Sequence, residues 1–309
     1  MLRAIVLGIV QGLTEFLPIS SSAHLAIVPK LLGYRAPELS FEILLHFGTL
    51  AAVVAYFARD LWEFVLSVVA PGRLDPGQAP VKRRLLVLLV LASVPAAALG
   101  YLLSDWADRQ TSRPLRAAVW LVLTTLILIA AELYAKRRTA RAVPAAYPED
   151  GGVRRAAATR AERLHGRGAV STVARTESAE EEVERLPTGK AIGIGVAQAV
   201  ALVPGTSRSG ITISAGLFEG VSREAAARFS FLLSIPAILG AGILKLPDLS
   251  GVTEPKAQLV AGFLAAAISG FLAVSGLLRL LRTRTLWPFI WYRIVAGSLF
   301  VLLLATVRN

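Results

Sequence analysis

The side chains best suited to chemistry gather near the start of the sequence, in GIVQGLTEFLPISSSAHL, from Gly8 to Leu25. Glu15 lies four residues after Gln11 and hence on the same helical face. Pro18 is followed by a hydroxyl cluster and a histidine, namely Ser20, Ser21, Ser22 and His24. Together they offer a metal ligand, a nucleophile and a proton-transfer group. The alternative is that the carboxylate and a serine only cap helices while the histidine packs inside the protein.

A second stretch, GVAQAVALVPGTSRSGIT from Gly195 to Thr212, repeats the first at a distance of 187 positions. Its arginine has a forked guanidinium suited to phosphate. A helix that begins near the serines would point free amides at the same place. The sequence therefore predicts an anion-binding loop with contributions from Gly205, Thr206, Ser207, Arg208 and Ser209. An ordinary helix break with capping serines is the alternative, but an arginine at membrane depth is functional by default.

The repeat pairs Ser21 with Arg208, since the two occupy equivalent positions in the two stretches. A pseudo-two-fold axis would bring both loop tips together. A phosphate held by Arg208 would then face Ser21 and His24. Glu42 and His46 also share a helical face, and they are expected either to support this site or to form a hydrogen bond between helices.

The elements that position these residues are membrane helices. Hydrophobic residues make up 55% of the chain and the mean hydropathy is +0.61, well above a soluble domain. Runs of spanning length recur at 41–58, 85–104, 116–134, 225–246, 257–281 and 288–307. The two motifs are poor spans, because each reads as two short helical pieces around a break, at 2–17 and 21–33, and at 188–203 and 209–219.

The predicted fold is an all-α integral membrane protein with six transmembrane helices plus two re-entrant helical hairpins in an inverted-topology repeat. Three spans lie between the hairpins, so the hairpins enter from opposite faces. The first repeat covers 1–134 and the second covers 188–309. Between them, 135–187 is a polar cytoplasmic insert, rich in Arg and Glu and without apolar periodicity.

The distribution of charge and the absence of cysteine limit which molecules the chain can bind and which chemistry it can perform. Lys and Arg concentrate in the 59–84 loop and in the insert, which places these in the cytoplasm and both termini outside. The start of the chain does not read as a cleavable signal peptide. The formal net charge is +12, and the basic residues behind it lie at membrane edges and in the insert. We therefore expect them to bind anionic membrane lipid, and we expect no nucleic acid as a partner. The absence of cysteine excludes disulfides and thiolate chemistry.

At these residues the chain resembles the undecaprenyl-pyrophosphate phosphatase family, also called the bacitracin-resistance protein family. GIVQGLTEFLPISSSAH and PGTSRSGIT resemble its two signature motifs. The resemblance extends to LLHFGTL, ARFSFLLSIPAI and WYRIVAG and covers nearly the whole chain outside 135–187. It implies a multi-pass enzyme of the bacterial plasma (inner) membrane whose active site opens to the outer face. The implied reaction converts undecaprenyl pyrophosphate into the monophosphate lipid carrier for cell-wall synthesis.

The resemblance also implies roles for single residues and a divalent cation, Mg or Ca. Glu15 and Gln11 match the family's acidic element, although Gln11 carries no charge and is the weaker metal ligand. Ser21 matches the proposed nucleophile, and His24 and Arg208 match the essential histidine and arginine. Supporting hydroxyls fall on Ser207, Ser209 and Thr212. A homodimer is compatible with the family.

Two alternatives stay open at this point. His24 or an activated water could replace Ser21 as the nucleophile. Paired hairpins in an inverted repeat are also transporter architecture, so the second candidate function is a transporter or flippase for a phosphorylated lipid or solute.

Overall fold

The chain folds into helices, and no strand occurs in residues 1–34, 37–104, 106, 109, 113–142, 178–245 and 254–306, which this computed structural model describes. Six helices in that part of the chain are long and apolar enough to cross a membrane. They are α3 (Leu39–Tyr56), α5 (Gln78–Leu102), α7 (Pro114–Ala142), α12 (Arg223–Leu244), α13 (Lys256–Leu281) and α14 (Trp287–Thr306). The six predicted spans are confirmed, although α5 begins earlier and α7 ends later than the hydrophobic runs indicate.

The boundaries of the predicted insert are helical. α7 continues to Ala142, inside 135–187, and α9 (Ala179–Glu184) precedes the second motif. A capping box fixes the start of α9, where Ser178 and Glu181 exchange hydrogen bonds between side chain and backbone. The rest of the predicted insert, 143–177, lies outside the described residues. The division into two repeats and an insert stays a prediction.

Each of the two motifs forms a pair of short helices around a break. The first pair is α1 (Leu2–Phe16) and α2 (Ser21–Leu31). The second pair is α10 (Thr188–Gln198), extended by the 3-10 turn η2 (Ala199–Leu202), and α11 (Arg208–Phe218). Pro18 and Pro204 lie in the two breaks, where a proline's missing N–H and fixed φ disfavour continuation of a helix.

Equivalent glycines bring the first helix of each motif against a long helix. A Cβ on Gly8 of α1 would lie 2.4 Å from the carbonyl oxygen of Gly262 in α13. A Cβ on Gly195 of α10 would lie 2.1 Å from the carbonyl oxygen of Ala92 in α5. Small residues allow such close backbone approach between membrane helices. α1 and α10 therefore each pack closely against a span at these glycines.

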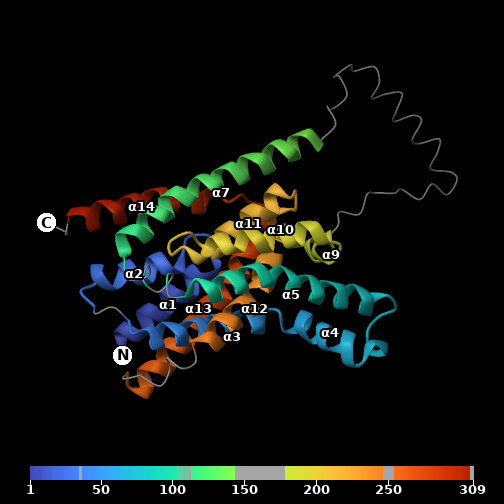
Figure 1. The fold of residues 1–309 in the computed structure, drawn as a ribbon, viewed down its shortest axis with the longest axis horizontal. Coiled ribbons are helices and arrows are strands. Elements are labelled where there is room, and N and C mark those ends of the chain that lie inside the picture. Colours follow the sequence, from blue (N-terminus) through green and yellow to red (C-terminus); the bar gives the residue numbers. More distant parts are fainter. Residues whose placement is uncertain are drawn as a thin grey trace, which may run out of the picture.

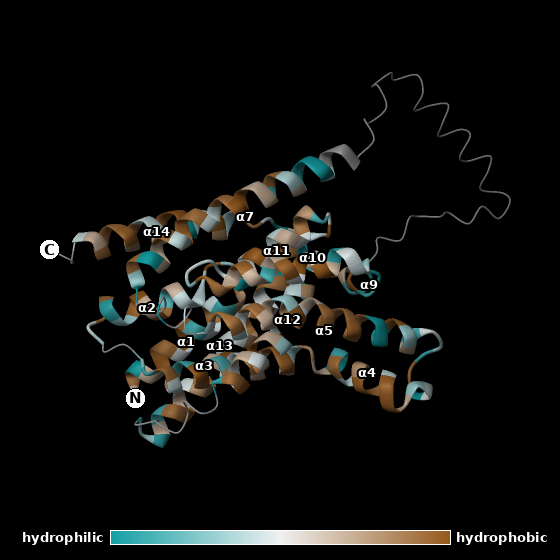
Figure 2. Ribbon diagram, viewed as in Figure 1, coloured by the Kyte–Doolittle hydropathy of each residue, from teal (hydrophilic) through white to brown (hydrophobic). Residues whose placement is uncertain are grey.

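The long helices present apolar side chains outward. Figure 2 shows hydrophobic residues along the middle of the spans and hydrophilic residues toward the far end of α7. On α5 the exposed apolar side chains include Val87, Val90, Leu91 and Val94. Scattered exposed apolar residues are normal in any protein, but a continuous belt on six spanning helices is what a lipid bilayer requires.

The two ends of the molecule differ in character. Both termini lie at one end, whereas the turn between α4 (Ala58–Val69) and α5 and the ends of the insert lie at the other (Figure 1). At this second end Lys82, although only 2% exposed, forms ion pairs with three carboxylates. These are Glu63 at 2.7 Å, Glu180 at 3.2 Å and Glu184 at 2.6 Å. The 59–84 loop and the insert are predicted on one face and the termini on the other, and the described residues of these segments lie at opposite ends in the same way (Figure 1).

Candidate active site

The breaks in the two motifs share an unusual backbone conformation. Ser20 has φ 73° and ψ 98°, and Ser207 has φ 71° and ψ 103°. They are the only non-glycine residues with positive φ in the described part of the chain. Such a conformation costs on the order of 1–3 kcal/mol and persists where the surroundings impose it, often at functional sites. Each serine also caps the helix that follows, by accepting a hydrogen bond from the backbone N–H of Ala23 or Gly210.

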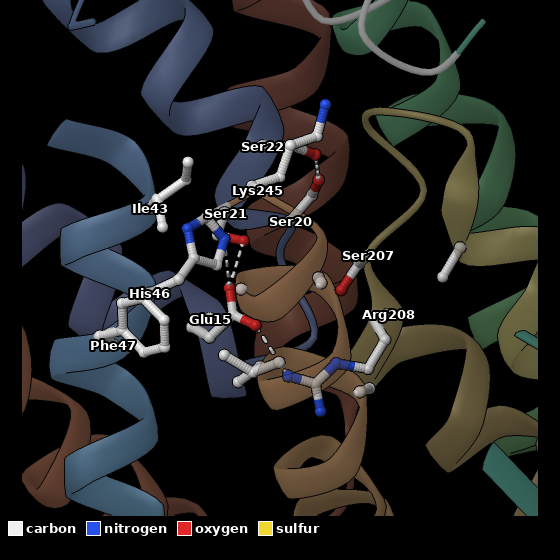
Figure 3. Close-up of a pocket in the computed structure, with 15 residues that line it drawn as sticks. Glu15, Ser20, Ser21, Ser22, Ile43, His46, Phe47, Ser207, Arg208 and Lys245 are labelled. Carbon is white, nitrogen blue, oxygen red and sulfur yellow. Dashed lines mark hydrogen bonds and ion pairs between the residues drawn. The ribbon is translucent and has the colours of Figure 1, made fainter. Parts of the chain in front are cut away.

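Glu15 lies at the centre of the site, and its two oxygens have different partners (Figure 3). The Ser21 hydroxyl donates to Oε2 at 2.7 Å, and the Gln11 amide donates to the same oxygen at 3.0 Å. Nη2 of Arg208 donates to Oε1 at 2.7 Å. His46 Nε2 is 3.7 Å from Oε2. The carboxylate is thus held between a hydroxyl from the first motif and a guanidinium from the second.

Hydrogen bonds between the motifs hold the two breaks side by side. The backbone N–H of Gly205 donates to the Ser22 hydroxyl at 3.0 Å. The Ser209 hydroxyl donates to the carbonyl oxygen of Leu17 at 3.0 Å. Each loop therefore satisfies polar groups of the other, which buried backbone requires.

A cavity of about 340 Å³ opens beside Glu15. Its polar lining comes from the two breaks and from His46 on the third turn of α3, with Lys245 after the end of α12. The apolar lining includes Ile43, Phe47 and Ile238. Of the predicted site residues, those that line the cavity are Glu15, Ser20, Ser21, Ser22, Ser207 and Arg208.

The other predicted residues of the second loop shape the site without lining the cavity. Gly205 has φ +97°, and a Cβ there would lie 2.2 Å from the Ala117 carbonyl oxygen, so only glycine fits. The Thr206 hydroxyl donates to the Val203 carbonyl oxygen at 2.7 Å. Thr212 and Ser209 are buried, and the Thr212 hydroxyl donates to the Arg208 carbonyl oxygen at 2.9 Å. These contacts fix the first turn of α11, from which Arg208 projects.

His24 lies behind the serine turn and is 3% exposed. Its Nδ1 is 2.7 Å from the Ser20 carbonyl oxygen, and its Nε2 is 2.8 Å from the Tyr292 hydroxyl. His24 does not line the cavity. Both ring nitrogens are occupied, so in this conformation the imidazole supports the turn at Ser20.

Arg293 of α14 is 1% exposed and also supports the breaks. It donates to the Pro18 carbonyl oxygen at 3.1 Å, to the Leu121 carbonyl oxygen at 2.9 Å and to the Thr125 hydroxyl at 2.9 Å. It also donates to the Thr124 hydroxyl, which in turn bonds to the carbonyl oxygen of Thr206 at 3.2 Å. A single buried guanidinium thus connects the first break to α7 and, through one hydroxyl, to the second break.

Two residues that line the cavity have little or no signal in the sequence. His46 was expected to act in support of the site or in a contact between helices, and it faces Glu15 directly. Lys245 was not predicted, because a lone lysine after a span reads as an ordinary membrane-edge residue. Only the folded chain brings the end of α12 over the serine turn.

Comparisons with known proteins identify the same family as the two motifs. The family model for bacitracin resistance protein BacA matches residues 4–299. An undecaprenyl-diphosphatase of Trichlorobacter lovleyi is 38% identical over 301 residues, which cover 96% of this chain and 94% of that protein. Undecaprenyl-diphosphatases of Moorella thermoacetica and Geobacter sulfurreducens are 39% and 40% identical, and in both cases at least 96% of each chain is covered. The chain therefore belongs to the bacitracin resistance protein BacA family.

Proposed function

We propose that this chain is an undecaprenyl-diphosphatase, which hydrolyses undecaprenyl diphosphate to undecaprenyl phosphate and inorganic phosphate. The family and the shared name of its relatives support this activity. The observation that carries it is Glu15, held at 2.7 Å from both a serine hydroxyl and an arginine at the edge of one cavity. A nucleophile, a proton acceptor and a fixed cation are the groups that cleavage of a phosphoanhydride needs.

In the first step the Ser21 hydroxyl attacks the terminal phosphorus. The bond from Ser21 Oγ to phosphorus forms as the bond from phosphorus to the bridging oxygen breaks. Glu15 accepts the serine proton through the hydrogen bond already present and passes it to the departing lipid phosphate. In the second step water attacks the phosphoserine and gives a proton to Glu15, which returns one to Ser21 as phosphate leaves.

Arg208 binds the terminal phosphate and stabilises the charge that develops on it. A guanidinium has five N–H donors, so the hydrogen bonds to Glu15 and to the Ser230 carbonyl oxygen leave others for phosphate. Ser207 lines the same cavity, and α11 directs its N-terminus at it, which favours an anion. Ser20 and Ser22 complete the hydroxyl lining.

The role of His24 in this scheme is to position the nucleophile. Its contact with the Ser20 carbonyl oxygen holds the turn that carries Ser21. The burial of the imidazole favours this role over nucleophilic attack by His24 itself.

The donor atoms near Glu15 fit a divalent cation that is shared with the substrate. Gln11 is fully buried, and its amide oxygen has no hydrogen-bond partner among the described residues. This oxygen and the Glu15 carboxylate are hard ligands of the kind that Mg²⁺ and Ca²⁺ prefer, with diphosphate oxygens as further ligands. A bound cation would neutralise part of the diphosphate charge. Among the described residues, no group of three acidic, histidine or cysteine side chains is placed to hold a metal ion, so the substrate is part of this proposed site.

The repeated motifs are re-entrant hairpins of an inverted-topology repeat. The matching φ and ψ at Ser20 and Ser207 and the matching glycines support this relation. The cavity is lined by residues of the first half of α3 and of the last turns of α12. With the basic loops in the cytoplasm, the site opens to the outer face of the bacterial plasma membrane. A homodimer stays a prediction.

Purified protein in detergent tests this function directly. We expect phosphate release from undecaprenyl diphosphate in the presence of Mg²⁺ or Ca²⁺, and loss of turnover in Arg208→Ala. Arg282→Ala is the matched control, since Arg282 pairs with Glu224 on the surface. Substrate movement across vesicles without phosphate release would instead identify a transporter.

A further inference from the structure

A second cavity of about 290 Å³ adjoins the catalytic cavity. The two share Ala201, Arg208, Ala237, Ala241 and Lys245 in their linings. The second is bounded mainly by apolar residues of α5, η2 and α12, among them Ala97, Leu202 and Pro236. A ligand with a charged end and an apolar end can therefore lie across both, with its charged end at Glu15 and Arg208.

Lys245 lies where the two cavities meet. It follows directly after α12 and is half-buried. Figure 3 shows it in the lining of the catalytic cavity together with Ser20 and Ser22. Because Arg208 and Glu15 form an ion pair, their charges largely compensate each other. Lys245 is a further basic side chain, and it lines both cavities.

Gln198 lies three positions before Ala201, which lines both cavities. It is 3% exposed, and neither its amide nitrogen nor its amide oxygen has a hydrogen-bond partner among the described residues. It lines the second cavity. Its equivalent in the first motif, Gln11, donates to Glu15, but the position equivalent to Glu15 is Leu202. A buried amide without a partner is unfavourable, and an anion at the junction would accept its N–H.

We propose that Lys245, assisted by the Gln198 amide, binds the phosphate that stays attached to the lipid. This inference rests on the proposed function. The terminal phosphate then lies at Ser21 and Arg208, and the first isoprenoid units lie in the second cavity. Lys245 selects a diphosphate by its second phosphate, and it does not take part in bond cleavage.

The test compares Lys245→Gln with Lys245→Arg, which keeps the charge. For Lys245→Gln we expect KM for undecaprenyl diphosphate and Ki for undecaprenyl phosphate each to rise about tenfold, as for loss of one charge-assisted hydrogen bond. We expect kcat and Ki for inorganic phosphate to stay within about twofold, because both depend on the terminal site. Lys245→Arg should restore most of the affinity for both lipids.

Lys256→Gln is the matched control, since Lys256 begins the next helix and is exposed; its constants should equal those of the unaltered protein. Unchanged lipid constants in Lys245→Gln, or a rise confined to inorganic phosphate, would overturn the assignment. Calorimetric titration with undecaprenyl phosphate tests Lys245 without turnover. Tight binding that Lys245→Gln weakens, in a protein that releases no phosphate, would reject the proposed function and keep this site.

Discussion

At the scale of single residues, the proposed chemistry depends on the two oxygens of Glu15, which have different hydrogen-bond partners. One accepts from Ser21 and Gln11, and the other accepts from Arg208. The amide of Glu15→Gln would keep the size of the side chain but lose its negative charge and its capacity to take a proton. We expect kcat to fall about 100- to 10,000-fold, the usual contribution of a general base, in a phosphate-release assay. Turnover within tenfold of the unaltered protein would show that another group accepts the serine proton.

The positioning role of His24 leads to a second expectation. In His24→Asn, phosphate release should slow, but phosphate trapped by rapid denaturation during turnover should still map to Ser21 by mass spectrometry. The reason is that His24 contacts the Ser20 carbonyl oxygen and Tyr292 and does not line the cavity. Ser21→Ala is the negative control, in which no phosphate should be trapped at this position. A phosphorylated His24 in the unaltered protein would reverse the roles of the two residues.

At the scale of elements, the break of the second motif packs closely against α7. Gly205 combines a positive φ with a neighbouring carbonyl, so Gly205→Ala adds both backbone strain and a clash. Gly33 has a comparable φ of +68° but open space around it, so Gly33→Ala adds strain alone. We expect Gly205→Ala to lower the thermal unfolding midpoint in detergent well beyond Gly33→Ala and to abolish activity. Equal midpoints for the two variants would mean that α7 yields to the added methyl group.

The sequence predicts the elements well because their signals are local. Proline and serine clusters mark both breaks, and hydrophobic runs mark the six spans. The spacing from Gln11 to Glu15 places both on one helical face, as the structure has them. The direction of His24 was not predictable in this way, because the turn at Ser20 sets how α2 is rotated. The place of Lys245 was not predictable either, because it lines the cavity together with serines of the first motif that are more than 200 positions away in the sequence.

At the scale of the whole molecule, ion pairs between side chains connect the elements at the end opposite the termini. Lys82 from the first half binds Glu180 and Glu184 of the segment that precedes the second half. Removing a buried cation leaves its carboxylates together without compensation. Lys82→Met should therefore lower the free energy of unfolding by about 3 kcal/mol or more, as measured by denaturant titration in detergent. Arg59→Ala, which breaks a pair on a 91% exposed side chain, is the control and should change stability little.

The ion pairs at this end should also make the stability of the fold depend on pH. Burial opposes ionisation of Glu63, but hydrogen bonds from Lys82 and Arg59 outweigh it and hold its pKa below the ordinary 4.5. For a lowered acid pKa, the stabilisation is complete above the unfolded-state value and is lost as pH falls through the folded-state value. The unfolding midpoint should therefore fall as pH drops below about 4.5, and less steeply in Glu63→Gln. Parallel pH curves for the two proteins would exclude Glu63 as a source of this dependence.

The hydrogen bond from Arg293 to the Pro18 carbonyl oxygen joins residues 275 positions apart. At about 5–20 residues per second, Pro18 is synthesised roughly 14–55 s before this arginine. The proposed nucleophile, Ser21, is thus synthesised among the earliest residues, and Arg293, which binds the break beside it, is synthesised among the last. A nascent or truncated chain that lacks α14 should carry every catalytic side chain and still hydrolyse nothing. We therefore expect activity to begin only when the last helix has entered the membrane.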